Sequence, residues 1–96
     1  TTGNINPQLE FTYAVFPNPV TDKANLQVTV EKRTEISMQL FDISGKFLGE
    51  IISKRYIDSG MNQINLILPQ QLSRGMYIFK IQVGFRSYPG KLLINK

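Results

Sequence analysis

Polar and apolar residues alternate along much of the chain with a period of two, the spacing that sends successive side chains to opposite faces of a β-strand. The alternation is clearest in residues 24–30, 36–41, 63–68 and 76–83. β-Branched and aromatic residues are frequent in these runs, which favours strands over helices. One apolar set is therefore predicted to face a common core: Leu26, Val28, Ile36, Met38, Leu40, Ile64, Leu66, Tyr77, Phe79 and Ile81.

Three further segments complete a set of about seven strands. They are Phe11–Phe16, Phe47–Ile57 and Lys91–Ile94. The middle one is the least regular, because Gly49 and the adjacent Ile51 and Ile52 interrupt the alternation, and a bulge or a bend is expected there. A helix is conceivable only over residues 69–73, which would form a single turn.

Turn-forming residues separate these runs at intervals of roughly 8–12 residues, the spacing typical of an all-β sandwich. The chain is too short and too poor in helical segments for the crossover units of a parallel sheet. The predicted fold class is therefore all-β, an antiparallel Ig-like β-sandwich of about seven strands.

The 96 residues allow one domain at most. Residues 1–10 are rich in Thr, Asn, Gln and Pro and have no period, so they are predicted to be a flexible linker, with the folded domain at 11–96. The chain starts with Thr and has no charged-then-apolar leader, so we expect it to be part of a longer precursor. Its apolar runs are far shorter than the roughly 20 residues of a spanning helix, so direct membrane insertion is not expected.

The composition excludes several kinds of chemistry, since the chain has no His and no Cys. Zinc-finger sites, Cys-ligated clusters and nucleophiles paired with His are therefore ruled out. Asp22 and Asp58 are not spaced as a catalytic pair, and no loop has the oxygen ligands of a calcium site. We predict no catalytic residue, metal or cofactor. The rival interpretation as an enzyme fragment would require a pocket with perturbed titratable groups.

The net charge of +4 and the pI near 9.6 raise the question of an anionic partner. The basic residues are scattered, however, and only Lys32-Arg33 and Lys54-Arg55 are adjacent. This distribution favours a solvated surface, and no nucleic-acid partner is predicted.

Two short segments have predictable local structure. In the turn Asp42–Lys46, Asp42 and Ser44 are expected to accept hydrogen bonds from the backbone and Gly45 to adopt a positive φ. Pro17-Asn18-Pro19 should be stiff and unsuited to the interior of a sheet, which predicts the end of an edge strand. The Tyr77 ring is expected in the core with its hydroxyl near the rim.

Exposed aromatic residues leave an alternative open. A carbohydrate-binding or fibronectin-like accessory module would present them as a ligand platform on its surface. The candidates for such a platform are Tyr13, Phe16, Tyr56, Phe85 and Tyr88.

Four motifs occur in a recognisable order. They are an aromatic residue followed by Pro17-Asn18-Pro19, the turn Asp42–Lys46, Leu72–Tyr77 with the sequence Leu-Ser-x-Gly-x-Tyr, and the closing segment Lys91–Lys96. Over residues 14–96 the chain resembles the C-terminal sorting domains of the type IX secretion system of the Bacteroidota. It departs from the family at Tyr88-Pro89-Gly90, where the family usually continues a β run and Pro89 is expected to shorten or kink the last strand.

The resemblance implies a non-catalytic secretion signal attached behind an N-terminal cargo. The implied route leads through the periplasm and the outer-membrane translocon to the cell surface or the extracellular space. The resemblance also implies that a sortase-like peptidase removes the domain, and residues 1–10 are the natural place for cleavage. Self-association stays open. By resemblance, translocon recognition is assigned to Pro17, Asn18, Pro19, Gly45, Lys46, Gly75, Tyr77, Lys91, Leu92, Leu93, Ile94 and Lys96.

The terminal segment Lys91–Lys96 suggests how recognition would work. A final strand is expected at the edge of a sheet, where unpaired backbone groups can be extended by a partner strand. The alternative is that Leu92 and Ile94 only complete the core.

Overall fold

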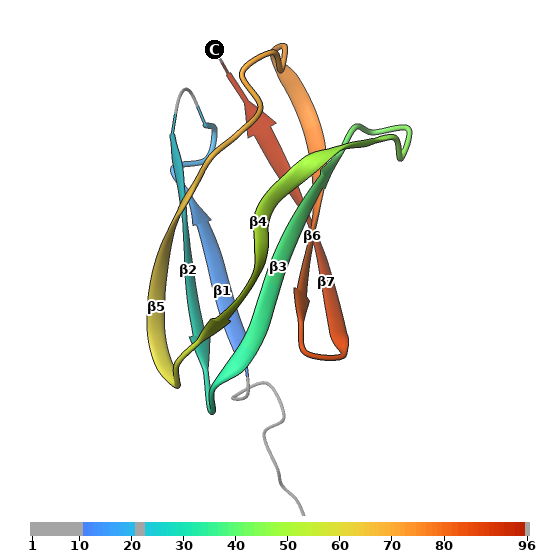
Figure 1. The fold of residues 1–96 in the computed structure, drawn as a ribbon. Helices are drawn as coiled ribbons and strands as arrows, with labels where there is room; N and C mark the ends of the chain where they lie inside the picture. The colour runs from blue at the N-terminus through green and yellow to red at the C-terminus, as the bar shows by residue number, and fades with distance from the viewer. Residues whose placement is uncertain (1–10, 21–22, 96) are drawn as a thin grey trace, which may run out of the picture.

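The computed structural model describes residues 11–20 and 23–95, and this part of the chain contains seven β-strands and no helix. Figure 1 shows two layers of strands facing each other. The strands are β1 (Phe11–Phe16), β2 (Ala24–Val30), β3 (Thr34–Phe41), β4 (Phe47–Ile57), β5 (Gly60–Leu66), β6 (Gly75–Val83) and β7 (Arg86–Ile94). The predicted all-β class is confirmed, and the segment considered for a helical turn contains only a turn at residues 70–71.

One sheet has the order β1-β2-β5 and the other the order β4-β3-β6-β7, with antiparallel pairing between all neighbours. This is the two-sheet arrangement of an Ig-like sandwich. In constant-type immunoglobulin domains the fourth strand joins the sheet of the first two strands. Here β4 instead pairs with β3 in the second sheet.

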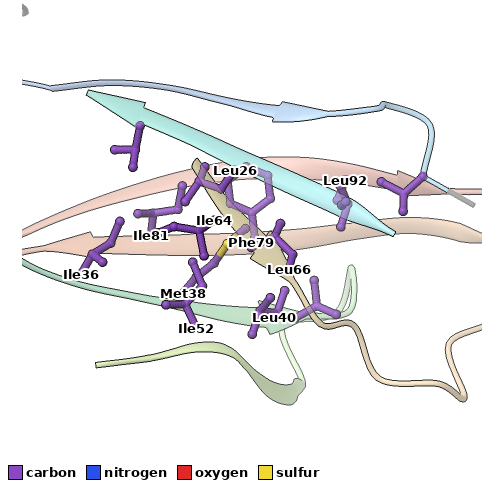
Figure 2. Close-up of a cluster of buried hydrophobic side chains, with 14 of the residues drawn as sticks. Leu26, Ile36, Met38, Leu40, Ile52, Ile64, Leu66, Phe79, Ile81 and Leu92 are labelled. Atoms are coloured by element: carbon purple, nitrogen blue, oxygen red, sulfur yellow. The ribbon is translucent and has the colours of Figure 1, made fainter. Parts of the chain in front are cut away.

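The core lies between the two sheets and is made of apolar side chains from β2 to β7 (Figure 2). All ten side chains predicted to face it are buried, with exposures of 7% or less. This outcome follows from the period of two, because burying one member of an alternating run buries its whole set. The core also includes Val20, Ala24, Val30, Ile51, Ile52, Ile57, Leu92 and Ile94.

The irregularity expected in the fourth strand is present. The register between β3 and β4 shifts near Ile36, Met38 and Leu40. As a result the consecutive residues Ile51 and Ile52 are both buried, which strict alternation would not allow.

Two strand boundaries differ from the sequence prediction. β5 runs from Gly60 to Leu66 rather than on to Leu68, and Ile67 is 81% exposed. Leu68 still packs against the core from the following loop. The last strand begins at Arg86, five residues before the predicted start. Pro89 does not shorten it, because β7 is a sheet edge, where a residue without an N–H is tolerated.

Candidate functional site at one end of the sandwich

The four sequence motifs all lie at the same end of the sandwich, which we call the motif end (Figure 1). The antiparallel order brings them together. β1 and β7 end there, β6 begins there, and the turn between β3 and β4 closes there. The turns after β2, β4 and β6 lie at the opposite end, where β1 also begins. Lys96 and residues 1–10 are outside the described residues.

The Pro17-Asn18-Pro19 segment follows the end of β1, an edge strand, as predicted. Both prolines follow cis peptide bonds. Beyond them Val20 is fully buried and forms a parallel bridge to Ile94 of β7. The chain therefore leaves the first sheet and joins the free side of the other sheet's last strand.

Backbone hydrogen bonds fix this crossing. The Val20 N–H donates to the Leu93 carbonyl at 2.8 Å, and the Asn95 N–H donates to the Val20 carbonyl at 2.7 Å. The Leu93 N–H also donates a long hydrogen bond, 3.4 Å, to the side-chain oxygen of Asn18. Two candidate site residues far apart in the sequence, Asn18 and Leu93, are thus in direct contact.

The turn between β3 and β4 is closed by Asp42. Its carboxylate accepts hydrogen bonds from the Ser44 N–H at 2.9 Å, the Ser44 hydroxyl at 2.6 Å and the Lys46 N–H at 2.9 Å. The hydrogen bond from Ser44 is the main reason why the pKa of the Asp42 carboxyl is lowered. Gly45 has a φ of 94°, a conformation that favours glycine.

The predictions for Asp42 and Gly45 are confirmed, and the one for Ser44 is wrong. The Ser44 hydroxyl donates to Asp42 instead of accepting from the backbone. All three hydrogen bonds go to one oxygen, Oδ1, and hold the Asp42 carboxylate against its own turn. The Lys46 side chain, in contrast, is exposed.

The Gly75–Tyr77 segment starts β6 and pairs with the end of β7. Gly75 lies opposite Ile94, and Tyr77 lies opposite Leu92. The Tyr77 ring is buried and its hydroxyl donates to the Ser73 carbonyl at 2.6 Å, which confirms the predicted placement. A tyrosine hydroxyl that returns to the backbone a few residues upstream is a recurrent feature of Ig-like sandwiches.

The terminal strand β7 has one buried and one exposed face. Leu92 and Ile94 are completely buried, so they cannot contact a partner while the domain is folded. Lys91 and Leu93 point outward. Of the terminal candidates that the structure describes, only Lys91 and Leu93 have side chains that a partner can reach. Leu92 and Ile94 pack in the core, as the alternative interpretation predicted.

The outer edge of β7 is less open than an edge strand usually is. Leu93 and Asn95 already bond to the Val20 segment. Pro89 has no N–H, and its carbonyl accepts a hydrogen bond from the Tyr13 hydroxyl at 3.3 Å. The predicted edge position is confirmed, but the expectation of a row of unpaired backbone groups is wrong for these residues.

The Tyr88-Pro89-Gly90 segment fits against aromatic rings from two other strands. Gly90 lies opposite Phe79 on β6, and a Cβ at this position would collide with the Phe79 ring. The Tyr13 ring of β1 meets Phe79 edge to face at 6.1 Å and lies 6.4 Å from Tyr88. Glycine is therefore required here by the close approach of a ring.

Sequence reasoning missed an apolar strip on the outer face of the four-stranded sheet. The outer strip consists of Phe47, Met76 and Leu93, which are exposed, and Phe41 and Ile78, which are half-buried. Its members are neighbours in register, because Phe41 lies opposite both Phe47 and Ile78, and Met76 lies opposite Leu93. The sequence contains a signal for this strip, because several strand positions that alternate with the core positions are also apolar, whereas a solvated face would be polar there.

The aromatic residues considered for a ligand platform do not form one surface. Tyr13 and Tyr88 lie together along one side of the sandwich, and Phe16 lies at the motif end. Phe85 is in the turn between β6 and β7 at the opposite end. Tyr56, on β4, lies 5.1 Å from the Arg33 guanidinium. The candidates are thus dispersed over several faces.

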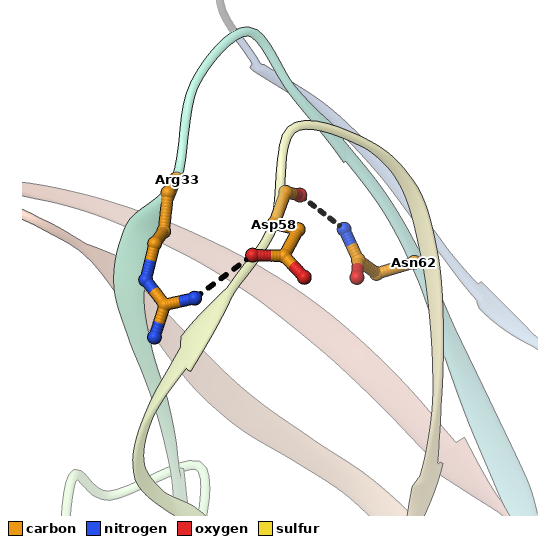
Figure 3. A network of polar contacts seen from close by, with 3 residues as sticks. All are labelled: Arg33, Asp58 and Asn62. Carbon is orange, nitrogen blue, oxygen red and sulfur yellow. Dashed lines mark hydrogen bonds and ion pairs between the residues drawn. The ribbon is translucent and has the colours of Figure 1, made fainter.

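The opposite end is held by polar contacts that are open to solvent (Figure 3). Arg33 forms an ion pair with Asp58 at 2.9 Å, and their side chains are 64% and 78% exposed. The Asn62 side chain donates to the Asp58 carbonyl at 2.8 Å. A depression of about 440 Å³ at this end is lined by residues that include Val30, Val83 and Phe85.

Within residues 11–20 and 23–95, no group of His, Cys, Asp and Glu side chains is arranged to hold a metal ion. The same part of the chain has no helix long and apolar enough to cross a membrane.

A family model described as "Secretion system C-terminal sorting domain" matches residues 14–95. No curated protein matches the sequence. Among solved structures, the fold is similar to part of the crystal structure of dimeric latent PorU from Porphyromonas gingivalis, with a TM-score of 0.67 and 16% sequence identity. The similarity covers 88% of this chain and 9% of that chain, so it establishes the Ig-like sandwich fold alone.

Proposed function

The chain belongs to the family of type IX secretion C-terminal sorting domains, and we propose that it directs an N-terminally attached cargo through the outer-membrane translocon without catalysing a reaction itself. A sorting signal of this system implies export to the cell surface or the extracellular space. The observation that carries the proposal is the family match, which runs from β1 to the end of β7. The route through the periplasm is part of the proposal.

The placement of the chain ends supports a signal that is read at the motif end. The start of β1 pairs with the end of β2, at the opposite end of the sandwich. A cargo attached ahead of β1 would therefore be separated from the motif end by the length of a strand. β7 has 9 residues, which corresponds to about 30 Å. The motif end is thus left accessible to a translocon while the cargo is attached.

Removal by a sortase-like peptidase is the second part of the proposal. Cleavage is expected within residues 1–10, ahead of the first strand, because a protease needs an extended segment that is not held in a sheet. Peptide bonds inside the strands are paired with neighbours and are poor substrates. The expected products are a cargo without the sandwich and a free domain that begins before Phe11.

A reporter experiment tests the proposal. A periplasmically exported reporter is fused ahead of residues 1–96 and produced in a bacterium that has a type IX secretion system. The matched controls are the reporter alone and the reporter fused to an unrelated Ig-like sandwich of similar size. We expect surface delivery, measured by protease accessibility on intact cells, only with this domain. Retention of all three reporters in the periplasm would refute the sorting function.

Mass spectrometry of the delivered reporter tests the cleavage separately. A product that ends within residues 1–10 is expected. A delivered reporter that keeps the whole domain would refute removal and leave sorting intact.

A further inference from the structure

The terminal strand offers a partner its outward face, since its inward face is in the core and its edge is already bonded around Leu93. Leu92 and Ile94 are in the core. The outer edge at Leu93 is bonded to Asn18 and Val20. A strand added at this edge would have to displace two backbone hydrogen bonds and expose a buried valine, whereas contact with the outward face displaces only water.

The outward face continues into the outer strip. Lys91, Ile78, Phe41 and Phe47 form one row across all four strands of the sheet. Met76 and Leu93, which are 45% and 38% exposed, form the adjacent row. The strip therefore joins the terminal strand to the Asp42–Lys46 turn through Phe47, which is 56% exposed. Contiguous apolar patches on a protein surface, unlike single exposed apolar residues, mark interaction sites.

Lysines border the strip. Lys46 precedes Phe47 in the chain, Lys91 occupies the same row, and the Lys80 ammonium group lies 5.9 Å from the centre of the Phe41 ring. The nearby carboxylates are Glu50, one row away, and Asp42, which is bonded within its own turn. A second copy of the domain would bring the same lysines against one another, so charge complementarity favours a different, acidic partner.

We propose that the outer strip is the surface by which a protein of the secretion apparatus recognises this domain, through an apolar segment flanked by carboxylates. The inference rests on the proposed sorting function and adds the face and the chemistry of recognition. It also assigns a role to Leu93 and Lys91 that differs from strand addition at the edge.

Paired substitutions in the reporter fusion test the apolar part. The strip variant is Phe47→Ser with Leu93→Ser. The matched control is Met61→Ser with Ile67→Ser, which removes two side chains that are 65% and 81% exposed. Met61 lies on β5 of the other sheet, and Ile67 directly follows that strand. We expect at least a tenfold loss of surface delivery for the strip variant and less than a twofold change for the control. Far-UV circular dichroism of the purified domains verifies that both fold.

A charge-reversal pair tests the lysines without removing apolar surface. Lys80→Glu with Lys91→Glu is compared with Lys54→Glu and Arg55→Glu, two exposed positions on β4 outside the strip. Both variants change the net charge equally. We expect delivery to fall only for the first pair, and we expect the parent domain to bind detergent-solubilised translocon with an affinity that decreases with salt.

The outcomes separate the two proposals. Delivery of the parent with equal delivery of the strip and control variants would overturn the strip and leave the sorting function standing. Failure of the parent fusion itself would overturn both. Binding to anionic phospholipid vesicles but not to solubilised translocon, if it depends on the strip, would overturn the proposal that the partner is a protein. Dimerisation that depends on the strip, measured by light scattering, would overturn the proposal that the partner is a different, acidic protein.

Discussion

The two ends of the sandwich differ in the length of their loops and in how these loops are held. The loops of the motif end are residues 17–23, 42–46 and 67–74, whereas those of the opposite end are only residues 31–33, 58–59 and 84–85. At the motif end, buried groups fix the loops. Val20 and Ile94 are fully buried, and Tyr77 anchors the chain ahead of β6. At the opposite end the residues of the turns are exposed, and Arg33 and Asp58 form an ion pair that is open to solvent. Residues of a sequence motif can therefore be required by packing, and a binding partner has to be sought at their exposed neighbours.

The largest loss of stability is expected from shortening a buried side chain at the motif end. Ile94→Ala should lower the free energy of unfolding by about 2–5 kcal/mol, because it leaves a cavity where the side chain was fully buried. Phe85→Ala at the opposite end should change it by less than about 0.5 kcal/mol, since that side chain is fully exposed. Urea denaturation of both variants measures the difference. Equal losses would contradict the contrast between the ends.

A hydroxyl-only change is expected to have a smaller effect. Tyr77→Phe removes the hydrogen bond to the Ser73 carbonyl and should cost about 1 kcal/mol. The control is Tyr56→Phe, which removes the hydroxyl of a side chain that is 59% exposed and should be close to neutral. Thermal and urea unfolding of the two variants provide the comparison. A neutral Tyr77→Phe would mean that water replaces the lost partner.

The contribution of Asp42 to stability should depend on pH. Hydrogen bonding lowers the folded-state pKa of Asp42 below 3.8, so its contribution to stability is present above that value and is lost as the pH falls through the folded-state pKa. Asp42→Asn should therefore lower the melting temperature at pH 7, with the gap to the parent closing below about pH 4. Asp58→Asn should produce a smaller change at pH 7. A gap for Asp42→Asn that stays constant down to pH 2 would show that the charge is not involved.

The smallest effect is expected from the ion pair at the opposite end. Arg33→Gln should cost between about 0 and 1 kcal/mol, because both partners are largely exposed and water screens their attraction. High salt should reduce the cost further. Denaturant titrations at two salt concentrations test this. A loss as large as that of Ile94→Ala would show that the two ends are equally dependent on their contacts.

The sequence predicted the strands better than the contacts of the site. All ten expected core residues are buried because alternation alone assigns a face to each side chain. The Asp42 turn was predictable because its hydrogen bonds join residues within four positions of one another. The terminal motif predicts recognition at Leu92 and Ile94, which are buried, because a motif does not distinguish a side chain needed for packing from one needed for binding.

The positions of the strands, the apolar side of each strand and the local turns follow from the amino-acid sequence, since these features depend on neighbours a few positions away. The Val20 segment lies 73 residues before Leu93 in the sequence, and its place at the edge of the last strand arises only when the chain folds. Folding also brings Phe41, Ile78 and Lys91 into one row. The physical reason is that register between strands distant in sequence is set when the two sheets bury their apolar faces together.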